Sequence, residues 1–197
     1  MAFFSAQNAG LAFMIVAVIN IIAAIVAVVL AVMDVEGFKE NGVVYYAICA
    51  VGELITSGLY FMYGQKVRNG QIDRKIDILA TFVKIVGITM IIGGLFAAAA
   101  VIAIGADIGA ALIGMIVPII LGLIVIFIAS KINDGKQTIG DKLIWIILLV
   151  VFVLSILVAI VEIISIVGIL YGICDLIIYS FMVLLLIDEE VKSEMGI

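Results

Sequence analysis

The sequence predicts an all-α, polytopic membrane protein with six transmembrane helices. Hydrophobic residues make up 67% of its 197 residues and charged residues only 13%, whereas a soluble domain is about half apolar and about a quarter charged. The mean hydropathy of +1.47 points the same way. The apolar residues also form long unbroken runs, which favour helices over the alternating strands of a membrane barrel.

The first four helices follow from the length of the apolar stretches. A helix needs roughly 20 apolar residues to cross a bilayer core about 30 Å thick. Residues 9–33 and 43–64 each satisfy this length, and Glu53 is the only charge in the second stretch. Residues 78–130 are about twice as long as one span requires. The glycine-containing segment 105–109 predicts a turn that divides them into two helices.

The last apolar stretch, residues 143–187, predicts the fifth and sixth helices, with a turn near residues 162–165. The connections between all these stretches are short. We therefore expect one transmembrane domain over residues 1–197 and no soluble domain. The N-terminal stretch has no basic region before it and is longer than the apolar part of a signal peptide, so we expect a helix that is retained.

The basic residues predict the orientation. Lys and Arg accumulate on the cytoplasmic side of membrane proteins. Only Lys39 falls on the side away from the termini, and eight basic residues fall on the other side. We therefore expect both termini in the cytoplasm, and the Ile/Val/Ala-rich composition favours a prokaryotic plasma membrane. The eight residues are Lys66, Arg68, Arg74, Lys75, Lys131, Lys136, Lys142 and Lys192.

The ends of the second and fourth predicted helices resemble each other. Residues 58–70 and 122–135 both start with Gly-Leu and finish with a basic residue followed by Asn and Gly. This similarity predicts three helical hairpins in series, over residues 9–64, 76–130 and 142–187. All three enter from the same side, so they would be parallel repeats, unlike the inverted repeats of many transporters. Chance similarity between apolar helices is the alternative.

Two acidic residues lie near the middle of predicted helices. A charge at the bilayer centre costs about 2.5–3.5 kcal/mol, so such residues are candidates for function. Glu53 is central in the second helix, and Asp175 lies at a similar depth in the sixth, between Tyr171 and Tyr179. The helical neighbours of Glu53 all carry polar atoms, which indicates a face turned to protein or water: Tyr46, Cys49, Thr56, Ser57 and Tyr60.

Two further polar residues complete the candidate site. Lys84, in the third helix, either pairs with Glu53 or extends its side chain to the headgroups. Asn20 lies on a stripe of alanines in the first helix. The candidate ion- or substrate-binding residues are therefore Glu53, Asp175, Lys84, Asn20, Tyr60, Tyr171 and Tyr179.

Two interpretations of these residues stay open. In the first, a transporter, a channel-like protein or a subunit of a transport system binds a cation, a proton or a small polar solute at the central carboxylates. In the second, the polar groups only fix helix register in a non-catalytic accessory subunit of a larger membrane complex. We take transport as the working hypothesis. The expected partners are the lipid bilayer and either further copies of the chain or other membrane subunits.

The sequence lacks residues that several other classes of function require. The chain has no His, so we expect neither an imidazole-dependent enzyme nor a haem protein, and no cofactor or metal site. The loop aspartates alternate with lysines instead of clustering as metal ligands would. Cys49 and Cys174 fall within helices and are expected to be core residues. The net charge of −5 does not suit a nucleic-acid-binding protein.

Overall fold

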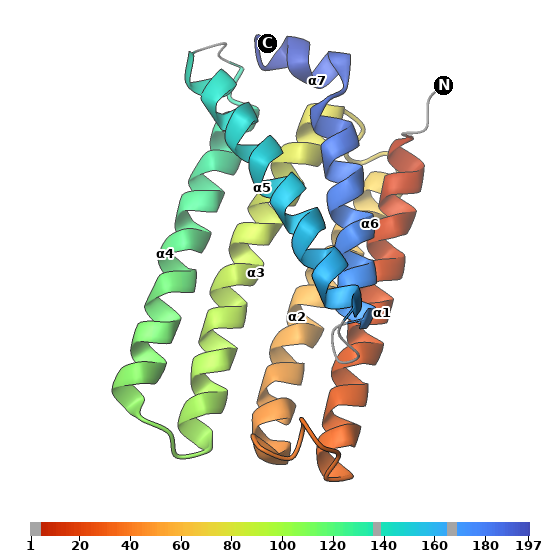
Figure 1. The fold of residues 1–197 in the computed structure, drawn as a ribbon. Helices are drawn as coiled ribbons and strands as arrows, with labels where there is room; N and C mark the ends of the chain where they lie inside the picture. The colour runs from red at the N-terminus through yellow and green to blue at the C-terminus, as the bar shows by residue number, and fades with distance from the viewer. Residues whose placement is uncertain (1–4, 136–138, 165–168) are drawn as a thin grey trace.

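The computed structural model describes residues 5–135, 139–164 and 169–197, and this part of the chain is helical without any strand (Figure 1). Six of its helices are long and apolar enough to cross a membrane, as the sequence predicts. A seventh, short helix follows them. The helices are α1 (Ala6–Val32), α2 (Gly42–Arg68), α3 (Lys75–Ala103), α4 (Ile108–Ile132), α5 (Ile139–Ile164), α6 (Ile169–Leu186) and α7 (Glu189–Glu194).

Local polar groups fix several helix ends. Ser5 precedes α1 and its hydroxyl accepts a hydrogen bond from the Asn8 N–H at 3.1 Å. Asp107 does the same for α4, accepting from the Ala110 N–H at 2.7 Å. Gly105 takes a φ of +80° in the preceding turn, a conformation that suits glycine. The predicted turn between the third and fourth helices is therefore confirmed.

The third hairpin differs from the prediction at both of its ends. α5 continues to Ile164, so Glu162 belongs to the helix and not to a turn, because Glu is a good helix former within an apolar run. The connection over residues 165–168 lies outside the described residues. The chain also forms α7 after Asp188, whose carboxylate accepts from the Glu190 N–H at 3.0 Å. The sequence analysis did not predict this helix.

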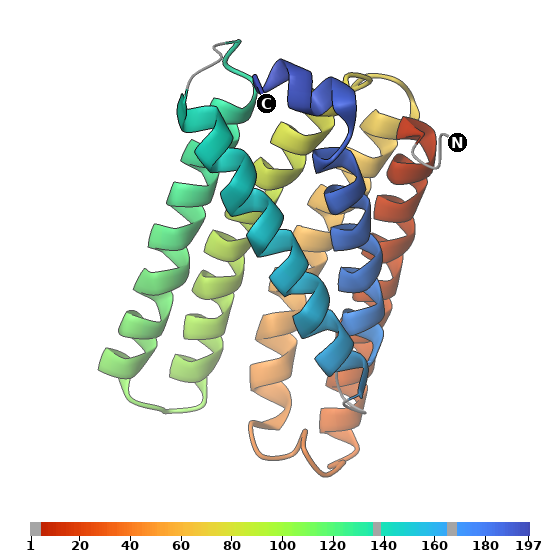
Figure 2. The same ribbon diagram turned by 45° about the horizontal axis from the view of Figure 1, so that its top comes forward.

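The helices pack mainly in consecutive pairs. The most extensive contacts are α1 with α2, α3 with α4 and α5 with α6, and the pairs are joined through α2–α3 and α1–α6. Contacts between α4 and α5 are sparse, and Figure 2 shows α5 crossing the bundle obliquely. Both termini lie at one end, which we call the termini face, and the connections 33–41 and 104–107 form the opposite, loop face (Figure 1). Parallel repeats and cytoplasmic termini stay predictions.

Small residues let paired helices touch along their backbones. A Cβ added to Gly87 would stand 2.6 Å from the carbonyl oxygen of Gly122, and one added to Gly122 would stand 2.5 Å from that of Gly87. α3 and α4 therefore cross too closely for any side chain. In the third pair, a Cβ added to Gly172 would stand 2.6 Å from the Ala159 carbonyl oxygen. Gly172 thus packs inside its own hairpin, against α5.

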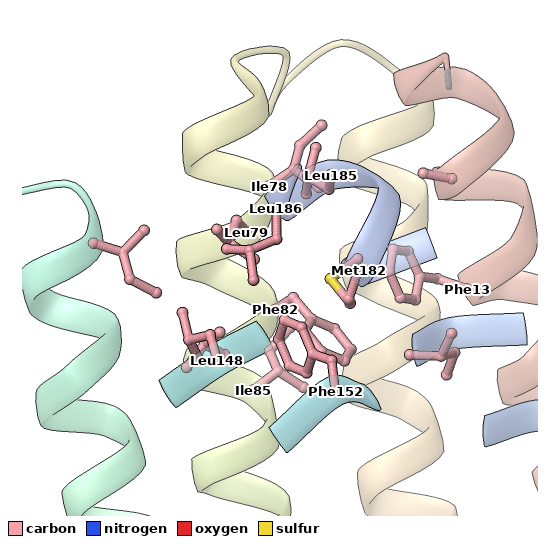
Figure 3. Packing of buried hydrophobic residues seen from close by; sticks show 14 of the residues in the cluster. Phe13, Ile78, Leu79, Phe82, Ile85, Leu148, Phe152, Met182, Leu185 and Leu186 are labelled. Atoms are coloured by element: carbon pink, nitrogen blue, oxygen red, sulfur yellow. The ribbon is translucent and has the colours of Figure 1, made fainter. Parts of the chain in front are cut away.

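The large buried side chains gather toward the termini face (Figure 3). Phe82 in α3 is fully buried at their centre. Its ring centroid lies 5.6 Å from that of Phe13, 6.1 Å from that of Phe152, and 6.4 Å from those of Tyr60 and Tyr179. Four different helices besides α3 thus send an aromatic ring to one residue. We call this group the aromatic core.

The segment after α6 is tied to the start of α3 by ion pairs. Lys75 lies 2.9 Å from a carboxylate oxygen of Asp188 and 3.1 Å from one of Glu190. Arg74 pairs with Glu194 at 2.5 Å. α7 lies across the termini face in both views of the bundle (Figures 1 and 2). These pairs hold it there, and we call them the α7 clamp.

Candidate functional site

Five of the seven predicted site residues line one cavity. It has a volume of about 450 Å³ and lies between α1, α2, α3 and α6. This size falls within the range of cavities that hold small organic ligands. We call it the inner cavity, and the five residues are Asn20, Glu53, Tyr60, Tyr171 and Asp175. The structure therefore brings together carboxylates that are far apart in the sequence.

A second cavity, of about 520 Å³, joins this site to the loop face. It is lined by α1, α2, the first residues of α6 and the loop residues Glu36 and Phe38. We call it the outer cavity. Cys49, Glu53 and Tyr171 line both cavities, so Glu53 stands where the two meet. The carboxylate is thereby connected to the loop face.

Glu53 is held by contacts within α2, beside a close approach of α3. Its side chain is half-buried, and the Thr56 hydroxyl donates to the Glu53 backbone carbonyl at 3.1 Å and lies 3.4 Å from the carboxylate Oε2. The neighbouring Gly52 leaves room for α3, since a Cβ there would stand 2.9 Å from the Phe96 side chain. This close approach brings α3 to the wall of the inner cavity.

Asp175 lines the same cavity as Glu53. Its side chain is half-buried in α6, and that of Glu53 reaches the cavity from α2. Neither cavity has a Lys or Arg in its described lining. Like charges in a partly buried site repel each other, and a bound cation or proton relieves that repulsion. The electrostatics of the site therefore favour positive ligands.

Asn20 adds an acceptor to the inner cavity. Its side-chain oxygen is buried and has no hydrogen-bond partner among the described residues. A buried acceptor without a donor costs about 1–3 kcal/mol. A water molecule or an N–H group of a ligand would remove this cost. Asn20 thus supplies a second type of group, besides the carboxylates, that binds a hydrogen-bond donor.

Lys84 lies away from the cavities. Its side chain is exposed, and no ion pair involves it in the described part of the chain. Gly93 lines the inner cavity and lies nine residues after Lys84 in the same helix. At about 100° per residue, this spacing places the two residues on opposite sides of the helix. The structure therefore does not bring Lys84 to Glu53, and its position agrees with the alternative of a side chain that reaches the headgroups.

Tyr179 belongs to the aromatic core. Its ring packs against those of Phe82 and Phe152. Tyr60 connects the two regions, because it lines the inner cavity while its ring lies 6.4 Å from that of Phe82. The site thus borders the outer cavity toward the loop face and the aromatic core toward the termini face.

Several lining residues were missed by the sequence analysis. Cys49 and Thr56 belong to the polar stripe around Glu53 and line the inner cavity, but neither was selected as a site residue. Thr89 and Phe96 of α3 also line it, and nothing in the sequence near them distinguishes them from other residues of an apolar helix. Their role follows only from how α3 packs against α2.

A scan of protein-family models, a search of curated proteins and a search of solved structures each find no match for this chain. The fold and the cavities therefore carry the functional argument. The six long apolar helices are compatible with an integral membrane protein. The chain is best described as an all-helical membrane bundle with carboxylates at the middle of its helices.

Proposed function

We propose that this protein is a small membrane transporter or channel-like protein, or a subunit of a transport system, that carries a cation or a proton past Glu53 and Asp175. One observation carries the proposal. Both carboxylates line the inner cavity, which shares Glu53 with an outer cavity lined by loop residues and borders the aromatic core at Tyr60. A binding site near the bilayer midplane that is open to one side is a recurring feature of transporters.

The charges of the lining support a positive solute. Glu36, Glu53 and Asp175 line the two cavities, and basic residues are absent from their described walls. An anion would meet repulsion along this route, whereas a cation gains from each carboxylate. Carboxylates at membrane depth are costly to keep charged, so neutralisation by a cation or a proton also lowers their energetic cost.

The orientation proposal follows from the basic residues. With the termini in the cytoplasm of a prokaryotic cell, the loop face lies outside the plasma membrane. The cavities would then open to the exterior, and the aromatic core would form the closed inner gate. Function in this form requires no catalytic residue and no cofactor.

The test is ion flux into liposomes that contain the purified protein. We expect Glu53→Gln and Asp175→Asn to abolish flux of the transported cation or of protons, with unchanged thermal unfolding midpoints in detergent. Glu40→Gln is the matched control, because Glu40 is exposed in the loop outside both cavities. It should retain wild-type flux.

Two results would contradict transport. One is wild-type flux in both carboxylate variants. The other is a wild-type protein without any flux together with a Glu53→Leu variant that is more stable than the wild type, which is the behaviour of a buried charge with a purely structural role. If the second result is found, native mass spectrometry of membrane extracts should show a stable complex with other subunits.

A further inference from the structure

We propose that the ligand of the two cavities is an organic ammonium ion with an apolar body, bound with its nitrogen at Glu53 and its body in the outer cavity. This inference rests on the proposed function and names the substrate class of the same site. It is drawn from the volume, the apolar lining and the aromatic rings of the outer cavity. The binding of a proton or a bare metal ion would require none of these three features.

The outer cavity is too large and too apolar for an inorganic ion alone. Its volume of about 520 Å³ is that of a site for an organic molecule. Hard metal ions take six or more oxygen ligands at about 2–2.6 Å, and no three acidic, thiol or imidazole side chains in the described residues are placed to hold one. Most of the wall is aliphatic: Ala23, Ala24, Val26, Ala27, Leu30, Val35, Ala50, Ile169 and Leu170.

Aromatic rings surround the route to Glu53. Phe38, Tyr45, Tyr46 and Tyr171 all line the outer cavity. The Tyr46 ring centroid lies 5.3 Å from that of Phe38 and 5.2 Å from that of Tyr45, and its hydroxyl donates to the Gly37 carbonyl at 3.3 Å. The loop and α2 thus form one aromatic wall. The faces of such rings attract organic cations and also cover their apolar parts.

The polar groups at the inner end match an ammonium group. Glu53 supplies a negative charge where the two cavities meet, and Asp175 and Asn20 lie beyond it in the inner cavity. The Asn20 side-chain oxygen lacks a donor among the described residues. An ammonium N–H can donate to these oxygens, while the hydrocarbon remains among the alanines and aromatic rings. Charge and apolar body are therefore recognised at opposite ends of one site.

Cys49 provides a direct measure of occupancy. It lines both cavities beside Glu53, whereas Cys174 is only 1% exposed. The rate at which N-ethylmaleimide modifies Cys49 of the detergent-purified protein is followed by peptide mass spectrometry. Four probes are compared: phenethylammonium has both charge and body, 2-phenylethanol has the body alone, and methylammonium and Na⁺ have the charge alone.

We expect phenethylammonium to slow the modification of Cys49 at a concentration about tenfold lower than 2-phenylethanol or methylammonium requires, since each lacks one of the two contributions. Na⁺ should give no protection. Glu53→Gln should remove the advantage of phenethylammonium over 2-phenylethanol. Tyr46→Leu should weaken phenethylammonium protection several-fold, and the exposed-loop control Glu40→Gln should retain it.

The outcomes separate this inference from the proposed function. Equal protection by phenethylammonium and 2-phenylethanol, or by phenethylammonium and methylammonium, overturns the inference. Glu53-dependent flux of protons or Na⁺ in liposomes without protection by phenethylammonium overturns it too, but supports transport. Protection that depends on Glu53 without any flux supports the ligand class and contradicts transport. Absence of both protection and flux overturns both proposals.

Discussion

The half of the bundle near the termini face is packed with large side chains, whereas the half near the loop face contains cavities whose walls combine small residues with aliphatic and aromatic ones. Phe82 and Met182 are completely buried in the first half. Ala27, Gly52 and Gly93 line cavities toward the second. Both halves are strongly apolar, so hydropathy does not separate them. The small residues at these positions leave space that large side chains fill in the other half.

The position of α6 adds to this difference. Its described residues begin at Ile169. The first residues of α6, Ile169 and Leu170, line the outer cavity. Figures 1 and 2 show that α6 starts well above the ends of α1 and α2 at the loop face. The described part of α6 therefore borders the outer cavity at its first residues.

The largest effect is expected from opening the aromatic core. Phe82→Ala should lower the free energy of unfolding by about 3–5 kcal/mol, because it removes the ring on which four other helices converge. Thermal unfolding in detergent measures this loss. Phe127→Ala is the matched control, since Phe127 is 63% exposed, and it should change stability by no more than about 0.5 kcal/mol. Equal losses in both variants would refute a closed core at Phe82.

A smaller effect is expected where α3 crosses α4. Gly122→Ala places a Cβ 2.5 Å from the Gly87 carbonyl oxygen, so the helices must separate, at a cost of about 1–3 kcal/mol. Gly114→Ala in the same helix meets no atom within 4 Å. It should instead gain up to about 1 kcal/mol from the better helix propensity of alanine. The two unfolding midpoints should therefore move in opposite directions, and a shift in the same direction contradicts the crossing.

The α7 clamp should contribute less. Lys75→Met removes ion pairs to Asp188 and Glu190, and such partly exposed pairs stabilise by about 1 kcal/mol or less. The loss should shrink as salt is added, because exposed charges are screened. Lys66→Met is the control, since Lys66 is exposed and has no ion pair in the described residues. A loss that salt leaves unchanged would contradict the ionic origin of the clamp.

The smallest effect is expected at Lys84. Its exposed position predicts that Lys84→Met and Glu53→Gln act independently on stability. In a double-mutant cycle their coupling energy should be within about 0.5 kcal/mol of zero. Rescue of Lys84→Met by Glu53→Gln would show that the two side chains pair in the membrane, and it would move Lys84 to the site.

The sequence predicted the positions of the helices better than it predicted which side of each helix turns toward the bundle interior. Apolar length and the turn at Gly105 located the spans, because crossing a bilayer constrains length directly. Lys84 shows the limit of this argument. Apart from Lys84, the membrane-spanning part of α3 is largely apolar on all sides, so no periodicity indicates which of its faces turns inward. Asp175 and Glu53 could be matched by depth alone, but that Lys84 points away from them follows only from the packing of α3 on α2.

The full walls of the cavities could not be predicted from the sequence. The inner cavity depends on how Phe96 packs over Gly52, and this contact is between residues without any sequence signal. The carboxylates carried a signal because charge is rare and costly in a membrane. Small residues carried little, since glycine and alanine occur both at tight crossings and at cavity walls. Cys49, which the sequence analysis expected in the core, lines both cavities.

The central claim is that the site at Glu53 is open to the loop face and closed to the termini face. The most direct test is modification of Cys49 by a membrane-impermeant maleimide in sealed vesicles of both orientations. Glu40→Cys and Lys66→Cys, each made in a variant without the native cysteines, mark the loop face and the termini face. We predict that Cys49 reacts in the vesicles in which the Glu40→Cys variant reacts, and not in those in which the Lys66→Cys variant reacts. Modification of Cys49 from the termini face, or from neither face, would contradict the account.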